Sequence, residues 1–256
     1  MRISTPILAI LFVFAGCSGD DSGTSPQLSK FNQRANGELV VGHPQAIVIS
    51  NPYGAIIVDG QSLDTTGTWF LDKWLLAASQ ESAIAQFSSV FIRCELVDTT
   101  LHISVEAPTG MAHLDVLLSV AVPQKTPCVV TSVNGETTVS GLHAKFVGEA
   151  MKTVHLASHS ASCNVSSVGG PIDIQMELPD GGFCIAQGAS GDISLQIPAT
   201  TSATLSAITS AGSVLCSGLR IVGQTTLPGM LSGSIGGGRG KIVLVTGSGN
   251  ISIRGF

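Results

Sequence analysis

The chain has 256 residues, a formal net charge of −5 and 11% charged residues, so it lacks the basic stripe that a nucleic-acid groove requires. Apolar residues make up 44% of the sequence, which is enough to cover a core and excludes a disordered chain. Glycine is abundant at 30 residues, and the many valines, isoleucines, threonines and serines between the glycines predict an all-β fold.

Residues 1–16 have the pattern of a lipoprotein signal peptide. Arg2 supplies a positive start, and residues 7–15 form an apolar run that is shorter than the roughly 20 residues needed to span a bilayer. The run ends at Phe14-Ala15-Gly16-Cys17, which resembles the bacterial lipobox, although Phe14 stands where that motif usually has Leu. Cys17 is therefore the predicted lipidation site, and an ordinary cleaved signal is the alternative.

Residues 17–37 are predicted to form the lipid anchor and a flexible tether, because Gly, Ser, Asp, Pro and Thr recur after the cysteine without periodicity. Ser18 stands where a signal for retention in the inner membrane usually has Asp. In a cell with two membranes, we therefore expect the protein to be exported and anchored to the outer one, on its periplasmic or surface face. The membrane, reached through this lipid, is the first predicted partner.

Residues 38–256 are predicted to form one β-strand-repeat domain with an insert at about residues 61–126. Alternating apolar residues and turn signals predict strands at residues 38–41, 46–49, 55–58, 91–96, 100–105 and 116–122. Within the insert, residues 80–87 contain Ala, Gln and Glu without glycine, which predicts a short helix. The segment 68–76 fits either a strand or a short helix.

The segment 130–142 is one of six copies of a repeat. Counted from a reference residue, apolar side chains recur at −7 and −5 and again at +2 and +4, although the copy at Gly135 has only the second of the two later positions. Such a period of two is typical of strands. The reference residues are Gly54, Gly135, Gly191, Gly212 and Gly249, with a weaker copy at Ala161.

Each reference glycine is predicted to be a structural corner. The apolar offsets change from odd to even across this residue, so the alternation of inward and outward side chains shifts by one residue at the corner. Glycine tolerates the positive φ that such a corner needs. Two folds fit this pattern. In a single-stranded β-helix or β-solenoid, the two arms lie on different faces and equivalent residues stack. In a β-hairpin-repeat sandwich, Asn-Gly closes a hairpin and the arms pair with each other.

The repeat segments 132–141 and 247–254 resemble the bacterial "putative adhesin" β-strand-repeat family, which is related to the head domain called GIN. That family shows an Asn-x-Gly strand pair, a helix-bearing insert, a strand ending in Pro, several repeats and a Gly-Gly-Gly segment. This chain has these features in the same order, at residues 51–60, 80–87, 116–123, 135–218 and 236–238. The resemblance covers about residues 38–256 and implies a β-solenoid-like fold. Ser160-Ala161, in place of Asn-Gly, and the many cysteines depart from the pattern.

Cysteine and histidine side chains are the first candidates for chemistry. Five cysteines follow Cys17, all at apolar positions of the pattern, which favours buried thiols with at most one or two disulfides; they are Cys94, Cys128, Cys163, Cys184 and Cys216. His155 and His159 would lie about 13 Å apart along a strand, too far to share one zinc ion. We therefore expect no metal and no cofactor.

Two further motifs are considered for catalysis or phosphate binding. Residues 236–241 resemble a phosphate-binding loop only superficially, because Ile242 stands where Ser or Thr should bind magnesium. Glu136 and Asp192 share the outward +1 position, and they are expected two coils apart, near 9 to 10 Å, just beyond the span of an inverting carboxylate pair. We therefore expect no enzymatic activity.

The sequence predicts a non-catalytic, lipid-anchored envelope protein, structural or adhesin-like, whose outer strand faces bind an envelope protein or a glycan. One alternative is an accessory partner in envelope-stress sensing, with an exposed docking patch in the insert formed by Trp69, Phe70, Trp74 and Leu75. A weaker alternative is a β-helical carbohydrate-active enzyme that uses Glu136 and Asp192.

Overall fold

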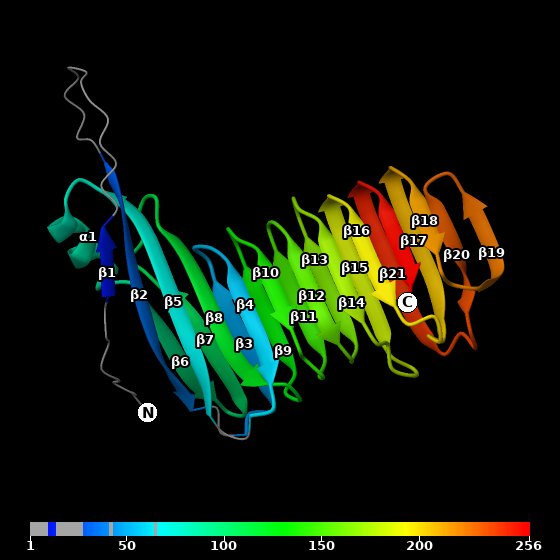
Figure 1. Cartoon of the computed structure of the whole chain (residues 1–256), viewed down its shortest axis with the longest axis horizontal. Helices are drawn as coiled ribbons and strands as arrows, with labels where there is room; N and C mark the ends of the chain where they lie inside the picture. Colours follow the sequence, from blue (N-terminus) through cyan, green and yellow to red (C-terminus); the bar gives the residue numbers. More distant parts are fainter. Residues whose placement is uncertain (1–9, 14–27, 41–42, 64–65) are drawn as a thin grey trace, which may run out of the picture.

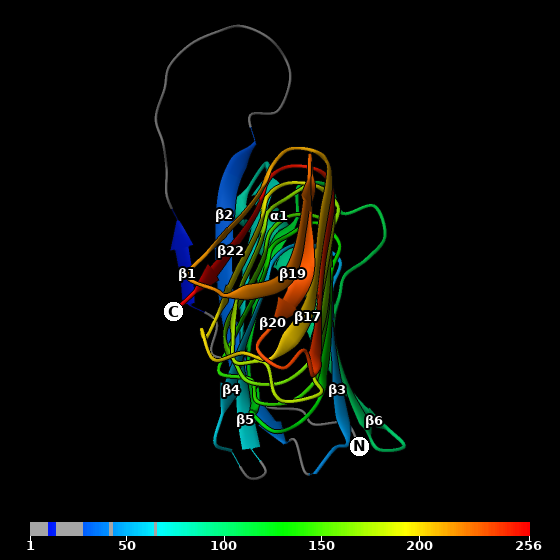
Figure 2. The same cartoon turned by 90° about the vertical axis from the view of Figure 1, so that its right-hand side faces the viewer.

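The computed structural model describes residues 10–13, 28–40, 43–63 and 66–256, and it is all-β with one helix in the described residues. The helix, α1 (Gln80–Phe87), is the one predicted within the insert. Two sheets of 11 strands each face one another along an elongated molecule (Figures 1 and 2). The core lies between the two sheets.

Both sheets run the length of the molecule. In spatial order, sheet A contains β1 (Ile10–Val13), β2 (Ser29–Val40), β5 (Thr66–Ala77), β8 (Asp115–Pro123), β4 (Ile56–Gln61), β10 (Thr137–Ser140), β12 (Val154–His159), β14 (Ile172–Met176), β16 (Ile193–Ile197), β22 (Ile251–Gly255) and β18 (Val214–Ser217). Sheet B contains β19 (Ile221–Leu227), β20 (Met230–Ile235), β17 (Ala203–Ala211), β21 (Gly240–Ser248), β15 (Phe183–Ser190), β13 (Cys163–Ser167), β11 (Phe146–Ala150), β9 (Cys128–Ser132), β3 (Ala46–Asn51), β7 (Thr100–Glu106) and β6 (Phe91–Val97).

The repeating element is a strand of sheet B followed along the chain by a strand of sheet A, which we call a two-strand unit. The described residues contain eight such units: β3–β4, β7–β8, β9–β10, β11–β12, β13–β14, β15–β16, β17–β18 and β21–β22. Strand β9 pairs in parallel with β3 and β11, whereas β10 pairs with β4 and β12. The two arms of segment 130–142 are therefore bonded to neighbouring units and not to each other, so the hairpin alternative is wrong.

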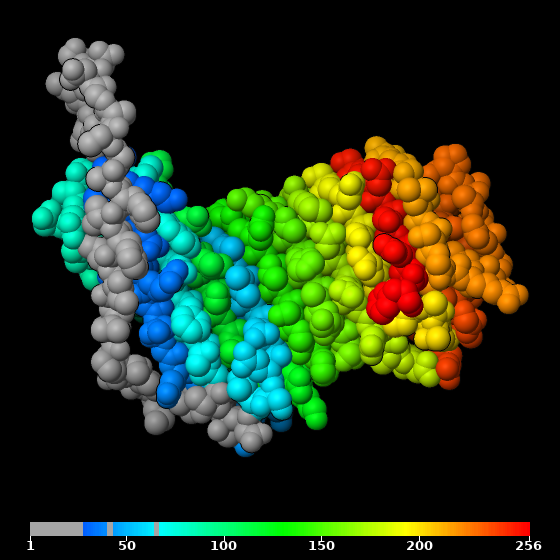
Figure 3. Space-filling model, viewed as in Figure 1, coloured from blue at the N-terminus to red at the C-terminus, as the bar shows by residue number. Residues whose placement is uncertain are grey.

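The units do not stack in chain order. Unit β3–β4 lies between β7–β8 and β9–β10, and unit β21–β22 lies between β15–β16 and β17–β18. Figure 3 shows the second exchange as the red segment lying between the yellow and orange segments. Near one end, the later units β7–β8 and β9–β10 are thus added on opposite sides of β3–β4. Near the other end, the chain leaves the position beside β15–β16 open, forms β17–β18 beyond it, and fills it later with β21–β22.

The core is built from rows of equivalent inward side chains. In sheet B, one row of register partners begins with Leu101 and ends with Leu205; its other members are Ile47, Cys128, Phe146, Cys163, Cys184 and Ile242, and all are buried. The ring of Phe146 fits because Gly148, on the same strand, has no side chain; a Cβ there would lie 2.6 Å from that ring. Burying such rows is the main stabilising contribution, at about 25 cal/mol per Å² of apolar surface.

Two predictions about the repeat are corrected by this register. The copy at Ala161 joins β12 of sheet A to β13 of sheet B, so it marks the return connection and not the corner within a unit. The predicted insert 61–126 is not wholly outside the repeat, because it contributes the complete unit β7–β8. Unit β11–β12 was missed because its corner, residues 151–153, contains no glycine.

The ends of the stack are built from antiparallel strands. At one end, β8 is followed outward by β5 and β2, and β7 by β6; at the other end, β17 is followed by β20 and β19. Segment 68–76, left open between strand and helix, belongs to strand β5. Strand β2 begins at Ser29, before the predicted domain start at residue 38. Strand β1 falls within the predicted signal peptide and pairs with β2.

Helix α1 closes the end of the stack formed by β2 and β5. Its N-cap Ser79 accepts a hydrogen bond from the backbone N–H of Ser82, which satisfies one of the free donors of the first turn. A small second core lies beneath the helix and consists of Phe31, Leu75, Ala77, Ala83 and Phe87.

Candidate functional site

A row of inward polar residues follows the sheet B strands just before the corners. In the units that contain a polar residue there, it stands three positions before the corner glycine, which is Gly170 in unit β13–β14. The row comprises Asn51, Ser132, Ser167, Thr209 and Thr246. All five are buried, and register pairs place them in one line with Ala150 and Gly188, which occupy the same position. This position was readable in the sequence, but a search for apolar residues overlooked it.

These polar side chains hold the corners of adjacent units together. Ser132 Oγ donates to the carbonyl of Gly54 at 2.8 Å and accepts from the N–H of Gly135 at 3.1 Å. Thr246 Oγ1 donates to the carbonyl of Gly191 at 3.0 Å in the same way. A buried polar group without a partner costs about 1–3 kcal/mol. The corner backbone supplies the partners of each hydroxyl, and the hydrogen bonds in turn stabilise that corner. The row is therefore used for structure.

The five predicted corner glycines all lie where two backbones nearly touch. A Cβ on Gly135 would be 2.2 Å from the carbonyl carbon of Gly54, and one on Gly212 would be 2.1 Å from the carbonyl oxygen of Gly249. Gly191 also has a positive φ, of 112°, as predicted. Gly54 and Gly135 do not, so positive φ is the wrong reason at these two corners. There, the close approach of the neighbouring unit excludes a side chain.

The two carboxylates considered for catalysis do not come together. Glu136 precedes β10 and Asp192 precedes β16, and the strands β12 and β14 lie between β10 and β16. Three strand spacings separate them by about 14 Å, not the two spacings predicted. Asp192 instead accepts a hydrogen bond from the N–H of Asn250 at 2.7 Å. The geometry does not support the carbohydrate-active enzyme.

The histidines also point in different directions. His155 is exposed on the outer face, whereas His159 is buried, because a strand irregularity at Ser158 (φ 51°) breaks the alternation. Burial lowers the pKa of His159, and its ring contacts Phe146 edge-on, with centroids 6.4 Å apart. Among the described residues, no three His, Cys, Asp or Glu side chains converge to hold a metal ion. The glycine-rich segment 236–239 connects β20 to β21, so a strand follows it, as the sequence indicated.

The one deeply buried lysine in the part of the chain that the structure describes is Lys73, on β5 beneath α1. Its Nζ donates to the carbonyls of Phe87 at 2.9 Å and Val90 at 3.2 Å, and it lies 5.7 Å from the centre of the Phe87 ring. Burial lowers the pKa of Lys73 to about 8. A cation at the end of a helix is favourable. Lys73 thus attaches the end of α1 to sheet A.

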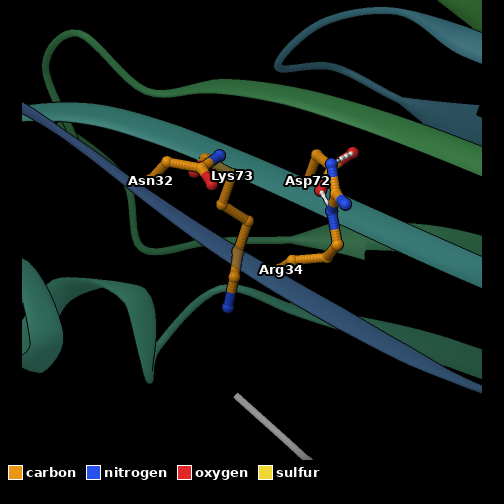
Figure 4. Close-up of polar contacts among 4 residues, drawn as sticks. All are labelled: Asn32, Arg34, Asp72 and Lys73. Carbon is orange, nitrogen blue, oxygen red and sulfur yellow. Dashed lines mark hydrogen bonds and ion pairs between the residues drawn. The ribbon is translucent and has the colours of Figure 1, made fainter. Parts of the chain in front are cut away.

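On the other face of β5, Asp72 pairs with Arg34 of β2, while Asn32 donates from its side chain to the carbonyl of Lys73 at 3.2 Å (Figure 4). The group as a whole joins β2 to β5. Nothing in its geometry requires a ligand.

The predicted docking patch of the insert is only partly exposed. Leu75 is buried in the second core, and Trp69 packs against the main core beside Gly37. Trp74 is half-buried, which leaves Phe70, 46% exposed, as the accessible member. The prediction of a continuous exposed patch is therefore wrong, and envelope-stress sensing loses the feature that suggested it.

The two outer faces of the stack differ in chemistry. The central outward row of sheet A is polar and consists of the register partners Thr138, His155, Asp173, Ser194 and Ser252. The central outward row of sheet B is mainly aliphatic, with Val48, Val129, Val147, Asn164, Ile185 and Val243. A second outward row of sheet B, nearer the corners, is polar and consists of Ser50, Thr131, Glu149, Ser166 and Gln187. Both faces are flat, regular and in register, so each can contact an extended partner along the molecule. These faces are the candidate functional surfaces.

The described residues contain no helix that is long and apolar enough to cross a membrane. The predicted lipidation site, Cys17, lies outside the described residues.

No protein-family model and no curated protein matches the chain. Among solved structures it is similar to a "putative cell adhesion protein" from Clostridium sporogenes, with 11% identity and a TM-score of 0.47 over 87% of this chain and 100% of that one. A "putative adhesin" from Bacteroides fragilis has 12% identity and a TM-score of 0.30 over 87% and 97% of the two chains. One from Parabacteroides distasonis has 10% identity and a TM-score of 0.27 over 85% and 96%. The names of these neighbours share the adhesin designation of the family that the sequence resembles.

Proposed function

We propose that this protein is a non-catalytic, adhesin-like protein of the bacterial cell envelope, and that the outer face of sheet A is its binding surface. The observation that carries the proposal is the polar row Thr138, His155, Asp173, Ser194 and Ser252, which continues in register over five adjacent parallel strands. Side chains at a regular spacing of about 4.8 Å suit a partner that is itself extended and polar.

We also propose that the two-strand units are coils of a β-solenoid. The strand register supports this interpretation, because parallel pairing joins each unit to the next in both sheets and equivalent apolar residues stack in rows. In a solenoid each coil contacts mainly its neighbours, so the fold extends a surface in one direction. Such a rod is a suitable carrier for a binding face held away from a membrane.

Hydroxyl, imidazole and carboxylate groups make up the polar row of sheet A, and they form hydrogen bonds with sugar hydroxyls or with an exposed peptide backbone. The partner is therefore a polar polymer of the envelope, either a glycan or an extended protein segment. The aliphatic row of sheet B has less capacity for such bonds, so it serves as the comparison surface.

The binding face can be tested with matched variants. Thr138→Arg with Ser194→Arg alters the polar row of sheet A in units β9–β10 and β15–β16, and Val129→Arg with Ile185→Arg alters the aliphatic row of sheet B in the same two units. Both pairs add the same charge. We expect only the first pair to abolish retention of the purified chain on isolated envelope material. Equal retention of both variants would contradict the proposal.

Anchoring and location are proposed from the sequence alone. Acylation of Cys17 would attach the protein stably, since one chain gives only marginal binding and a lipoprotein has more than one. We expect Cys17→Ala to release the protein from membranes and to remove the mass of the lipid. Protease added to intact cells should degrade a surface-facing adhesin, and full protection would place it on the inner face and count against adhesion.

A further inference from the structure

Cys163 and Cys184 are direct neighbours in the core. They are register partners on the parallel strands β13 and β15, and both side chains point inward with 0% exposure. Adjacent strands lie about 4.8 Å apart, which falls within the Cα separation of about 4.4–6.8 Å found in disulfides. Both thiols are free in this structure.

The contact between the two thiols is supported by their electrostatics. The neighbouring Cys163 thiol, and after it burial, raise the pKa of Cys184 well above its ordinary value. The Cys163 thiol donates its hydrogen bond to Met176 Sδ, at 3.7 Å. No backbone oxygen competes with Cys184 for this thiol among the hydrogen bonds of the described residues.

The register makes this pair selective. Cys128 stands in the same row, but Phe146 lies between it and Cys163, which places Cys128 and Cys163 two strand spacings, or roughly 9.6 Å, apart. Cys94 faces Ile103, and Cys216 faces Ile253, at opposite ends of the stack. Of the five cysteines that the structure describes, only Cys163 and Cys184 are register partners.

We propose that Cys163 and Cys184 are oxidised to a disulfide that joins units β13–β14 and β15–β16. The oxidant is a second disulfide, either of a thiol–disulfide exchange protein or of a small thiol. One cysteine thiolate attacks it and forms a mixed disulfide, and the other cysteine then displaces the second thiol. The two cysteines lose two protons and two electrons, and the oxidant is reduced to two thiols.

Neither sulfur is accessible in the folded chain, so the exchange takes place before β13 and β15 pack. The inference rests on the proposed envelope location for its oxidising surroundings, since disulfides form in exported proteins. The stereochemistry itself is independent of location. Refolding in a glutathione redox buffer tests the disulfide separately from the proposed function.

The test uses the full chain, refolded with oxidised and reduced glutathione, then unfolded and alkylated without reduction. Compared with the fully reduced and alkylated chain, we expect a mass that lacks two alkyl groups. We also expect a proteolytic fragment pair linked through Cys163 and Cys184. Cys163→Ala and Cys184→Ala should each abolish the linked pair. Cys128→Ala, a truncation in the same buried row, should retain it.

Stability gives an independent readout. A disulfide that closes a loop of this length stabilises a protein enough to raise the unfolding temperature by roughly 6 °C or more. Reduction should lower that temperature in the wild type and in Cys128→Ala, but not in Cys163→Ala. Five alkylated thiols besides Cys17 after oxidative refolding, or a linked pair that includes another cysteine, would overturn the proposal.

Discussion

The middle of the stack and its two ends are built by different rules. In the middle, from β9–β10 to β15–β16, units follow chain order and all pairing is parallel. At the ends, strands are antiparallel, chain order is broken, and α1 with Lys73 covers one edge. The stack is therefore extended by repeating one type of unit, whereas irregular elements terminate it.

The largest expected effect tests whether a corner requires glycine because of close contact or because of backbone conformation. Gly135→Ala in the middle places a Cβ against the backbone of Gly54, which cannot move aside, so we expect a loss of about 3 kcal/mol or more in urea unfolding. Gly181→Ala, at a turn with φ 73° and no atom within 4 Å of the added Cβ, should cost about 1 kcal/mol. Equal losses would show that φ, not contact, determines the requirement for glycine.

The polar row gives a second test in the middle of the stack. Ser132→Ala leaves the Gly54 carbonyl and the Gly135 N–H without their side-chain partner, so we expect a loss of about 2 kcal/mol. Thr131→Ala, on the outward side of the same strand, is the matched control and should stay within about 0.5 kcal/mol. Similar values for both variants would mean that the corner bonds do not support the middle of the stack.

The regular middle could be predicted from the sequence, but the order of its units could not. Corner glycines such as Gly135 and Gly249 marked five units correctly, because close packing leaves a visible residue type. Three units were missed. Unit β11–β12 turns at residues 151–153 without glycine, and unit β7–β8 has a long connection. Unit β13–β14 has Gly169 and Gly170 at its corner, but the copy at Ala161 took β13 as its second arm. The exchange of β21–β22 with β17–β18 leaves no trace, because Ile, Leu and Val fit any position of a stacked row.

The candidate surfaces were predictable only in part. Alternation identified outward positions, but the difference between the two faces depends on which strands are neighbours. Glu136 and Asp192 were placed one strand too close for the same reason. Burial of Leu75 and Lys73 depends on α1 packing over β5, a contact that a strand pattern does not record.

Lys73 gives a pH-dependent test of the irregular end. Its folded pKa of about 8 lies below its ordinary 10.5, so folding disfavours the charged form. Stability is therefore lowest below pH 8 and rises as the pH increases from 8 to 10.5, by up to about 3 kcal/mol, at 1.36 kcal/mol per pKa unit. Lys73→Met should remove this rise, and the exposed Lys125→Met should leave it intact. A rise that persists in Lys73→Met would assign it to another group.

The smallest effect is expected at the other end, on the edge strand β18. Leu215 is 65% exposed there, so Leu215→Ser should change the free energy of unfolding by less than about 0.5 kcal/mol. A larger loss, measured by urea unfolding at two protein concentrations, would show that this edge is covered by a second copy in solution.

The displaced unit β21–β22 also constrains how the chain acquires its structure. Because it follows β17–β20 in the chain but pairs between β15–β16 and β17–β18, the earlier strands cannot complete their sheets when they are first synthesised. Contacts that close only across such intervals slow folding, since the intervening segment must first be ordered. While the chain is synthesised from its N-terminus, the position between β15–β16 and β17–β18 therefore stays unfilled until β21–β22 has followed.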